Sequence, residues 1–351
     1  MNKTFHNTQA SQGLYPLLFE NNFVEMVWGG HRLKPLKGLP ADDQPIGESW
    51  EVSALPGHES IVKNGALAGT PLPQLVQDWG AALLGQHNIT RWGSRFPLLV
   101  KLIDSESDLS IQVHPNDQTA LQRHQSLGKT EMWYVLDAKP GATLFSGFRE
   151  HITPYECEHR VADGSICQVL NELSAQRGDV FFIPAGRVHA IRAGLMLIEI
   201  QESSDITYRL YDYGRLGLDG KPRQLHTEQA RDVIDYNLHD NYRTAYNPEA
   251  NEPVTLVDCP HFTTKYFNVT RPFHRKLYKY DSFVIYICME GNCNIVCNTS
   301  ASKSADDCMT VHLLRGHTCL IPACLADVQL VPDNLTRASR IMEVYIGNRN
   351  R

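Results

Sequence analysis

The sequence predicts a mainly β protein made of two related β-units, with a small helical insertion in the first half. Short apolar runs separated by Gly and Pro follow one another along most of the chain, which is typical of β-sandwiches and barrels. The length of 351 residues is enough for two hydrophobic cores. One strand-and-turn pattern also occurs twice, so a single repeated unit accounts for both cores.

The elements follow in a simple order along the chain. Runs such as FVEMVWGG and IGESWEVS in the first sixty residues predict strands and turns. The stretch LPQLVQDWGAALLG has apolar residues at helical spacing and predicts the insertion, near residues 72–92. Strand-like runs continue to LMLIEIQ, a polar and partly helical connector covers 226–247, and strands resume from TTKYFNVT onward. We therefore expect two domains, 1–240 with the insertion and 241–351.

An internal repeat links the two domains. GDVFFIPAGRVHAI in the first half matches GHTCLIPACLADVQ in the second, and both place Pro six residues after their first Gly. Upstream, EMWYVLDA aligns with FVIYICME, so that Glu131 faces Phe283. Further along the alignment, His189 faces Asp327. The second copy has largely lost the polar residues of the first, which predicts one active unit and one degenerate unit.

Composition excludes several classes of protein. The net charge of −6 and the pI of about 6.2 give no indication of a nucleic-acid surface. No apolar run reaches the roughly 18 residues of a membrane span, and the polar N-terminus lacks the apolar core of a signal peptide. The nine cysteines contain no CxxC pair, so we expect reduced, mostly buried thiols and a cytoplasmic protein. The sequence carries no signal for the oligomeric state.

The strand LSIQVHPND, 109–117, presents an unusual polar face. Ile111 and Val113 alternate with Gln112 and His114, so the amide and the imidazole lie on one side of the strand. Pro115 then ends the strand. A half-buried strand ordinarily offers Ser, Thr or Lys to water, so this pair of side chains indicates a binding role.

A second pattern supplies further donors. The spacing Gly-x5-Pro-x-Gly-x2-His is complete in Gly178, Pro184, Gly186 and His189. It resembles the second half of the cupin signature, that of a small jelly-roll barrel with a metal in its mouth. The Asn that usually follows is absent. The resemblance implies a fold of two cupin-like jelly-roll units, of which the first binds metal.

The first half of that signature is altered here. The usual HxH is replaced by Gln112-x-His114, and the acidic residue, Glu131, follows after a longer insertion. With His189, these residues provide two imidazoles, one carboxylate and one amide, and no thiolate. This donor set suits Zn²⁺ or another first-row divalent ion, with an open position for water or substrate.

At a finer level, SIQVHPND, GKTEMWYVL, GDVFFIPAGRVHAI and QESSDITYRLYDYGR together resemble type I phosphomannose isomerase in its short bacterial form. The resemblance runs from about residue 14 to about residue 230 and is weak over the C-terminal third. It implies one Zn²⁺ per chain, catalytic Arg209 and a pocket residue, Lys129. The metal ligands it implies are Gln112, His114, Glu131 and His189.

The resemblance implies interconversion of mannose 6-phosphate and fructose 6-phosphate. Such an aldose–ketose isomerase moves a proton between C2 and C1 through an enediolate, which a divalent metal can stabilise. Arg209 can add to that stabilisation or clamp the phosphate. Asp205 and Lys129 are both candidates for moving the proton.

Two other hypotheses use the same residues differently. A non-catalytic cupin could bind a sugar or sugar phosphate, because cupins serve many roles. The complete donor set together with Arg209 favours the enzyme, since a binding protein needs no Lewis acid and cation side by side. An Fe²⁺ cupin dioxygenase is disfavoured because Gln112 replaces the first His of the usual HxH. We expect the C-terminal unit to be a structural partner of the catalytic one.

Overall fold

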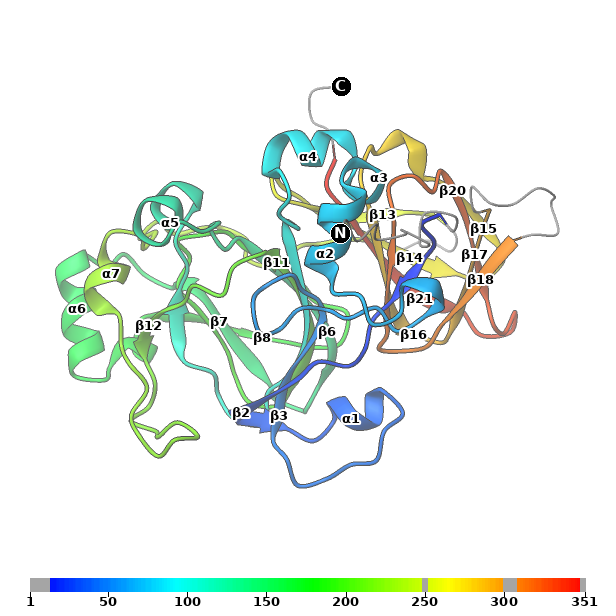
Figure 1. Ribbon diagram of the computed structural model, residues 1–351. Coiled ribbons are helices and arrows are strands. Elements are labelled where there is room, and N and C mark those ends of the chain that lie inside the picture. Colours follow the sequence, from blue (N-terminus) through cyan, green and yellow to red (C-terminus); the bar gives the residue numbers. More distant parts are fainter. Residues whose placement is uncertain (1–12, 248–251, 299–307, 348–351) are drawn as a thin grey trace. The chain divides into compact units, whose positions relative to one another are not determined.

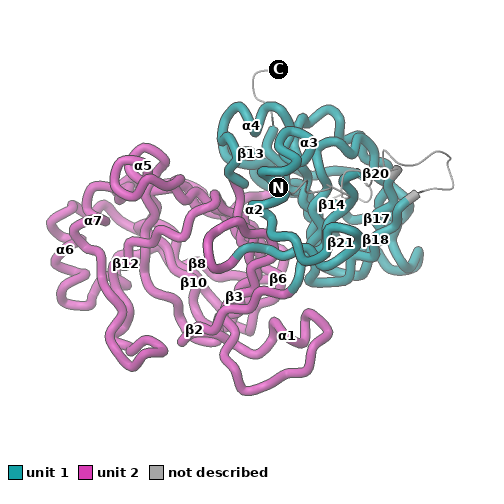
Figure 2. Tube along the Cα trace, in the orientation of Figure 1, with its two compact units in different colours: residues 1–20, 59–96, 246–351 teal, residues 21–58, 97–245 magenta. Residues whose placement is uncertain are grey.

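The structure, a computed structural model, describes residues 13–247, 252–298 and 308–347 and is mainly β (Figure 1). Its strands form four antiparallel sheets with few helices, as the sequence predicts. The chain divides by contacts into two compact units (Figure 2). Unit 1 comprises 1–20, 59–96 and 246–351, and unit 2 comprises 21–58 and 97–245.

Unit 2 contains two sheets. The six-stranded sheet has the order β2-β3-β4-β11-β6-β9, and the five-stranded sheet has the order β12-β5-β10-β7-β8. The strands of the first are β2 (Phe23–Gly30), β3 (Ile46–Val52), β4 (Leu98–Asp104), β6 (Glu131–Ala138), β9 (Val180–Ile183) and β11 (Leu195–Glu202). The strands of the second are β5 (Ile111–Val113), β7 (Thr143–Phe148), β8 (Leu170–Ser174), β10 (His189–Ile191) and β12 (Tyr208–Tyr211).

The two sheets of unit 2 pack face to face. Trp133 and Leu197 of the six-stranded sheet share one buried cluster with Leu144 and Ile191 of the five-stranded sheet. This shared core is what alternating apolar residues on both sheets produce. A second cluster covers the outer face of the five-stranded sheet with helix α6 (Pro154–Ala162), which begins with a capping box at Thr153.

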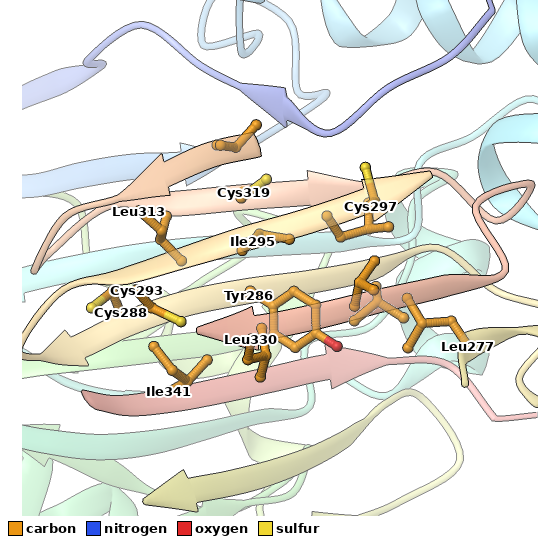
Figure 3. Close-up of a cluster of buried hydrophobic side chains, with 14 of the residues drawn as sticks. Leu277, Tyr286, Cys288, Cys293, Ile295, Cys297, Leu313, Cys319, Leu330 and Ile341 are labelled. Carbon is orange, nitrogen blue, oxygen red and sulfur yellow. The ribbon is translucent and has the colours of Figure 1, made fainter. Parts of the chain in front are cut away.

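Unit 1 repeats this arrangement. Its six-stranded sheet has the order β1-β19-β16-β21-β14-β13, and its four-stranded sheet the order β15-β20-β17-β18. Figure 3 shows their common core, in which Tyr286 and Ile341 of the larger sheet lie with Ile295 and Leu330 of the smaller one. The strands are β1 (Leu17–Leu18), β13 (Val254–Asp258), β14 (Thr263–Val269), β15 (Phe273–Lys276), β16 (Val284–Glu290), β17 (Cys293–Asn298), β18 (Cys308–Leu313), β19 (Thr318–Ile321), β20 (Asp327–Pro332) and β21 (Ser339–Tyr345).

The helical insertion is present as three short helices of unit 1. They are α2 (Leu72–Trp79), α3 (Ala81–Leu84) and α4 (Gln86–Trp92), and glycines with positive φ separate them. Contacts group these helices with the C-terminal strands, so the compact units interleave along the sequence. The assignment of an active domain to 1–240 and of a degenerate, structural domain to 241–351 stays a prediction.

The remaining helices are short. They are α1 (Leu33–Leu36), α5 (Asp117–His124) and α7 (Thr227–Arg231), with 3₁₀ turns at Gly65–Leu67, Ile166–Gln168 and Leu277–Lys279. Within the described residues, no helix has the length and apolar character needed to cross a membrane. None of the eight cysteines whose side chains the structure describes forms a disulfide, and burial raises the pKa of Cys157 to about 11, so that thiol stays protonated.

The strand registers correct the repeat alignment by one residue. In unit 2, Glu131 pairs with Ile183, the residue before Pro184. In unit 1, the residue before the matching proline is Ile321, and it pairs with Val284. Glu131 therefore corresponds to Val284 and not to Phe283, because only the strand pairing fixes the register of such apolar runs.

Candidate metal centre

Three buried side chains converge inside unit 2. His114 follows β5, Glu131 begins β6 and His189 begins β10. The Nε2 atoms of His114 and His189 lie 3.5 Å and 3.4 Å from the two carboxylate oxygens of Glu131. Gln112 pairs in register with His189, and its amide nitrogen lies 3.3 Å from the Nε2 atom of that histidine.

Backbone carbonyls fix the tautomer of both histidines. The Nδ1 atom of His114 lies 2.9 Å from the carbonyl oxygen of Ile206, and that of His189 lies 2.8 Å from the carbonyl oxygen of Arg187. A carbonyl can only accept, so each Nδ1 atom is the donor. Burial lowers the pKa of both imidazoles, that of His189 to about 4. Both rings are therefore neutral, with their Nε2 lone pairs beside Glu131.

Glu131 is fully buried, and neither carboxylate oxygen accepts a hydrogen bond within the described structure. The Nζ atom of Lys129 lies 3.0 Å from Oε2, an ion pair without hydrogen-bond geometry. Burial raises the pKa of Glu131, and the charge of Lys129 opposes that rise. A buried carboxylate whose two oxygens accept no hydrogen bond is costly unless a further group completes it.

The spacing of these atoms fits a divalent metal. Tetrahedral bonds of about 2.0–2.1 Å from a metal to nitrogen and oxygen place the ligand atoms roughly 3.3–3.4 Å apart. The distances from His114 Nε2 to Glu131 Oε2 and from His189 Nε2 to Glu131 Oε1, 3.5 Å and 3.4 Å, are close to this value. Rotation of the Gln112 amide by half a turn would present its oxygen, in place of its nitrogen, beside His189.

A cavity of about 370 Å³ adjoins this group, a size suited to a small molecule. Gln112, Lys129, Asp205 and Arg209 all line it, and His114, Glu131 and His189 contact the first two from behind. The structure thus brings every residue of the expected site together in unit 2. The other lining residues are Val24, Met26, Trp28, Glu48, Trp50, His58, Lys101, Ile103, Leu109, Ser110, Ile191, Glu199, Thr207, Arg223 and His226.

Lys129 is a buried cation between carboxylates. Its Nζ atom lies 3.9 Å from Glu199 Oε1, in addition to its contact with Glu131. Burial alone would lower the pKa of Lys129, but the two carboxylates outweigh burial and raise it. The ammonium is therefore charged in the folded protein.

Arg209 and Asp205 occupy the cavity wall. Arg209 pairs in register with Gln112, and it donates from Nε to Ser110 and from Nη1 to the carbonyl oxygen of Gln224. Burial, followed by the charge of Arg223, lowers the pKa of Arg209. The side chain of Asp205 is exposed.

Sequence reasoning missed a row of buried charges on the six-stranded sheet. Lys101 lies 3.2 Å from Glu48 and pairs in register with Glu199. The indoles of Trp50 and Trp133 donate to Glu48 and Glu199, respectively. A signal was present, since Lys101 in LLVKLID and Glu199 in LMLIEIQ each have apolar residues on both sides within a strand, where a charge needs a partner or a function.

Sequence reasoning also missed the basic residues that the hairpin after β12 brings to the cavity. Arg223 and His226 line it, and the buried carboxylate of Asp212 accepts from both Arg223 and Arg215. A turn is present at Asp219-Gly220, where Gly220 has φ +74°.

Comparisons with known proteins bear on this site. The family described as phosphomannose isomerase type I, catalytic domain, matches residues 17–144. The mannose-6-phosphate isomerase of Streptococcus mutans is 38% identical over 71% of this chain and 77% of its own length. A probable mannose-6-phosphate isomerase of Bacillus subtilis, GmuF, is 40% identical over 73% and 78%. The solved structure of the mannose 6-phosphate isomerase from Bacillus subtilis superposes with a TM-score of 0.80 and 28% identity, over 94% of this chain and 99% of that one.

Proposed function

Since the chain belongs to the type I phosphomannose isomerase family, we propose that it interconverts mannose 6-phosphate and fructose 6-phosphate, with one Zn²⁺ in unit 2. The ligands would be Gln112, His114, Glu131 and His189. The observation that carries the proposal is the buried Glu131 carboxylate, unused by hydrogen bonds and facing two neutral imidazoles beside the cavity.

The reaction moves a proton between C2 and C1 of the open-chain sugar. A Zn²⁺ held by these residues would supply a Lewis acid able to polarise the carbonyl of the substrate. The fixed tautomers of His114 and His189 keep each ring proton on Nδ1, which donates to a backbone carbonyl, and leave Nε2 without a proton on the side of this centre.

The side chains of the cavity perform the remaining tasks. Arg209, held by Ser110 and the backbone of Gln224, stabilises the negative charge of the enediolate. Lys129 lies at the junction of the metal ligands and the cavity, and Asp205 lies on the cavity wall. These two side chains are the candidates for carrying the proton between the carbons.

A coupled isomerase assay on mannose 6-phosphate tests the proposal. The purified protein should turn over, lose activity on chelation and regain it with Zn²⁺. Arg209→Ala should lower kcat roughly 100-fold or more, because it removes a charge that acts on the transition state. Arg231→Ala is the matched control, since Arg231 is an exposed residue paired with Glu158 outside the cavity.

Each outcome separates the hypotheses. Activity that survives complete removal of metal contradicts the metal assignment. A metal-loaded protein that binds the sugar phosphate without turnover is a non-catalytic cupin. Loss of activity in Asp205→Asn with Lys129→Met still active would identify Asp205 as the proton carrier, and the reverse result would identify Lys129.

A further inference from the structure

Positive charge gathers at one wall of the cavity. Arg209, Arg223 and His226 line this wall, and Arg215 lies behind it on the same hairpin. Burial and the charges of Arg223 and Arg215 lower the pKa of Arg209, whereas the charge of the Asp212 carboxylate raises it. Three guanidinium groups around one carboxylate leave an excess of positive charge, which favours an anionic ligand.

Each of the three lining residues keeps a donor that the described structure does not use. Arg209 engages Nε and Nη1, which leaves Nη2. Arg223 engages Nε and Nη2 on Asp212, which leaves Nη1. The Nδ1 atom of His226 accepts the backbone N–H of Arg209, so the neutral ring carries its proton on Nε2.

Asp212 positions Arg223. The hairpin that follows β12 closes on itself through a bridge between Leu216 and Pro222 and a hydrogen bond from Gly217 to Lys221. At its base, Asp212 accepts from Arg215 on the outgoing arm and from Arg223 on the returning arm. Because the carboxylate binds Arg223 in bidentate fashion, it fixes the plane of that guanidinium at the cavity wall.

We propose that Arg223 and His226 bind the phosphate group of the sugar phosphate, with Asp212 as the positioning residue. The inference rests on the proposed function and assigns its substrate specificity to the hairpin. Arg209 lies between this pair and the candidate metal ligands, since it pairs with Gln112 and its backbone contacts His226. This order matches the substrate, whose 6-phosphate lies at the opposite end from the reacting carbons.

Steady-state kinetics on mannose 6-phosphate, with inorganic phosphate as competitor, tests the assignment. Arg223→Gln should raise both KM and the inhibition constant of phosphate roughly 10- to 100-fold, the effect of losing a hydrogen bond to a charged group. The kcat value should stay within about threefold, because the phosphate contact is the same in ground and transition states. His226→Gln should act in the same direction by a smaller factor, and Arg223→Lys should restore part of the loss.

Two further variants sharpen the test. Arg231→Gln removes one positive charge from the neighbouring helix outside the cavity and should leave both constants unchanged. Asp212→Asn should raise KM and the phosphate inhibition constant together, because Arg223 is then no longer held. A lower kcat with unchanged KM and inhibition constant in Arg223→Gln would overturn the assignment, as would equal constants in Arg223→Gln and Arg231→Gln.

A binding measurement keeps this inference separate from the proposed function. Calorimetric titration with inorganic phosphate should show weaker binding to Arg223→Gln and His226→Gln than to the unmodified chain and Arg231→Gln, whether or not the protein turns over. Absence of turnover with this difference present would contradict the isomerase and retain the phosphate site. Thermal melting of each variant checks that it is folded, and equal phosphate affinity in all folded variants would refute the site.

Discussion

Lys129 gives the candidate metal centre a resident positive charge. Its Nζ atom lies 3.0 Å from Glu131 and 3.3 Å from the Nε2 atom of His114, in a region closed to solvent. The buried carboxylate thus has a counter-ion even when no metal is bound. This pairing explains how Glu131 can be both fully buried and short of hydrogen bonds.

Replacement of Lys129 by Met should therefore lower the free energy of unfolding most in the metal-free protein. We expect Lys129→Met to lower the free energy of unfolding of the metal-free protein by about 3–5 kcal/mol, since it leaves a buried carboxylate unpaired. Bound Zn²⁺ would supply the missing charge and reduce that loss. Urea unfolding of both proteins, with chelator and with saturating Zn²⁺, measures the difference, and an equal loss under the two conditions would contradict this role.

Individual residues of the site were predictable where a local pattern names them. The period of two placed Gln112 and His114 on one face, and the glycine-proline spacing identified His189. Sequence reasoning did not identify Glu48, Lys101 and Glu199, because they come from three strands that are far apart in sequence. Only the register of the sheet brings their charges into one row.

At the scale of single elements, the hairpin after β12 depends on the ionised carboxylate of Asp212. Burial alone would raise the pKa of Asp212, but hydrogen bonds from Arg223 and Arg215 outweigh burial and lower it. A lowered pKa in the folded state means that this group contributes stability above its ordinary pKa, about 4. That contribution is lost as the pH falls through the lower folded value.

The acid limb of the stability curve should show this dependence. Below about pH 4, the unmodified protein should lose stability more steeply than Asp212→Asn, which lacks the titrating group. Near pH 7 the unmodified protein should be the more stable of the two, because Asp212→Asn lacks the ion pairs at the base of the hairpin. Thermal melting between pH 3 and pH 7 tests both statements, and parallel curves would contradict the assignment of the shift to Asp212.

Helix α4 depends on a glycine at its start. Gly85 has φ +91°, and a Cβ atom there would overlap the backbone of Asp281, whose side chain accepts hydrogen bonds from the N–H groups of Gln86 and His87. The overlap involves main chain, so the helix start has to move if the glycine is replaced. Gly93, at the end of the same helix, also has positive φ but has open space around it.

These two glycines make a matched pair of substitutions. Gly85→Ala should cost more than about 3 kcal/mol, because strain from positive φ adds to the steric overlap. Gly93→Ala should cost about 1 kcal/mol, from positive φ alone. Chemical denaturation of the full chain measures both, and equal losses would show that the contact with Asp281 is not decisive.

Elements were predictable by type and less so by boundary. Apolar spacing identified helical structure near 72–92, but the glycines at 80 and 85 divide it into three helices. Strand runs were equally clear, yet their alignment between the repeats was off by one residue. Apolar side chains alone do not distinguish neighbouring registers within such runs, whereas ladder pairing does.

At the scale of the whole molecule, the two units keep one buried charge in common. The registers that align Glu131 with Val284 also align Glu199 with Glu343 and Trp133 with Tyr286. In unit 1, Glu343 accepts two hydrogen bonds from Arg275 and one each from Tyr280 and Tyr286. Unit 1 therefore has Val284 at the position of the candidate metal ligand Glu131, but it has a buried carboxylate, Glu343, at the position of Glu199, and Arg275 neutralises it.

This difference predicts that the stability of unit 1 depends on Arg275 and not on a metal. Arg275→Leu should cost about 3–5 kcal/mol, because Glu343 stays buried without its partner. The double variant with Glu343→Leu should recover most of that loss. Zn²⁺ content should be unchanged in both proteins, and a loss of metal together with stability would contradict a purely structural role.

The hydrophobic cores, and not the metal, should hold the fold. We expect His114→Ala to abolish bound Zn²⁺ while the protein still melts cooperatively, because each unit has its own buried core. Metal analysis and thermal melting of the same sample test this. An unmodified protein that unfolds at room temperature once metal is removed would refute it.

The counter-ion of Glu131 also sets the order in which the enzyme matures. With the ammonium of Lys129 already paired to that carboxylate, a newly synthesised chain can complete its fold before it meets any metal. The cavity that adjoins Gln112 and Lys129 then offers an entry route for the ion. On the proposed assignment, metallation would be the last step of biogenesis, and the pool of folded but inactive protein should grow when zinc is scarce and shrink when zinc is plentiful.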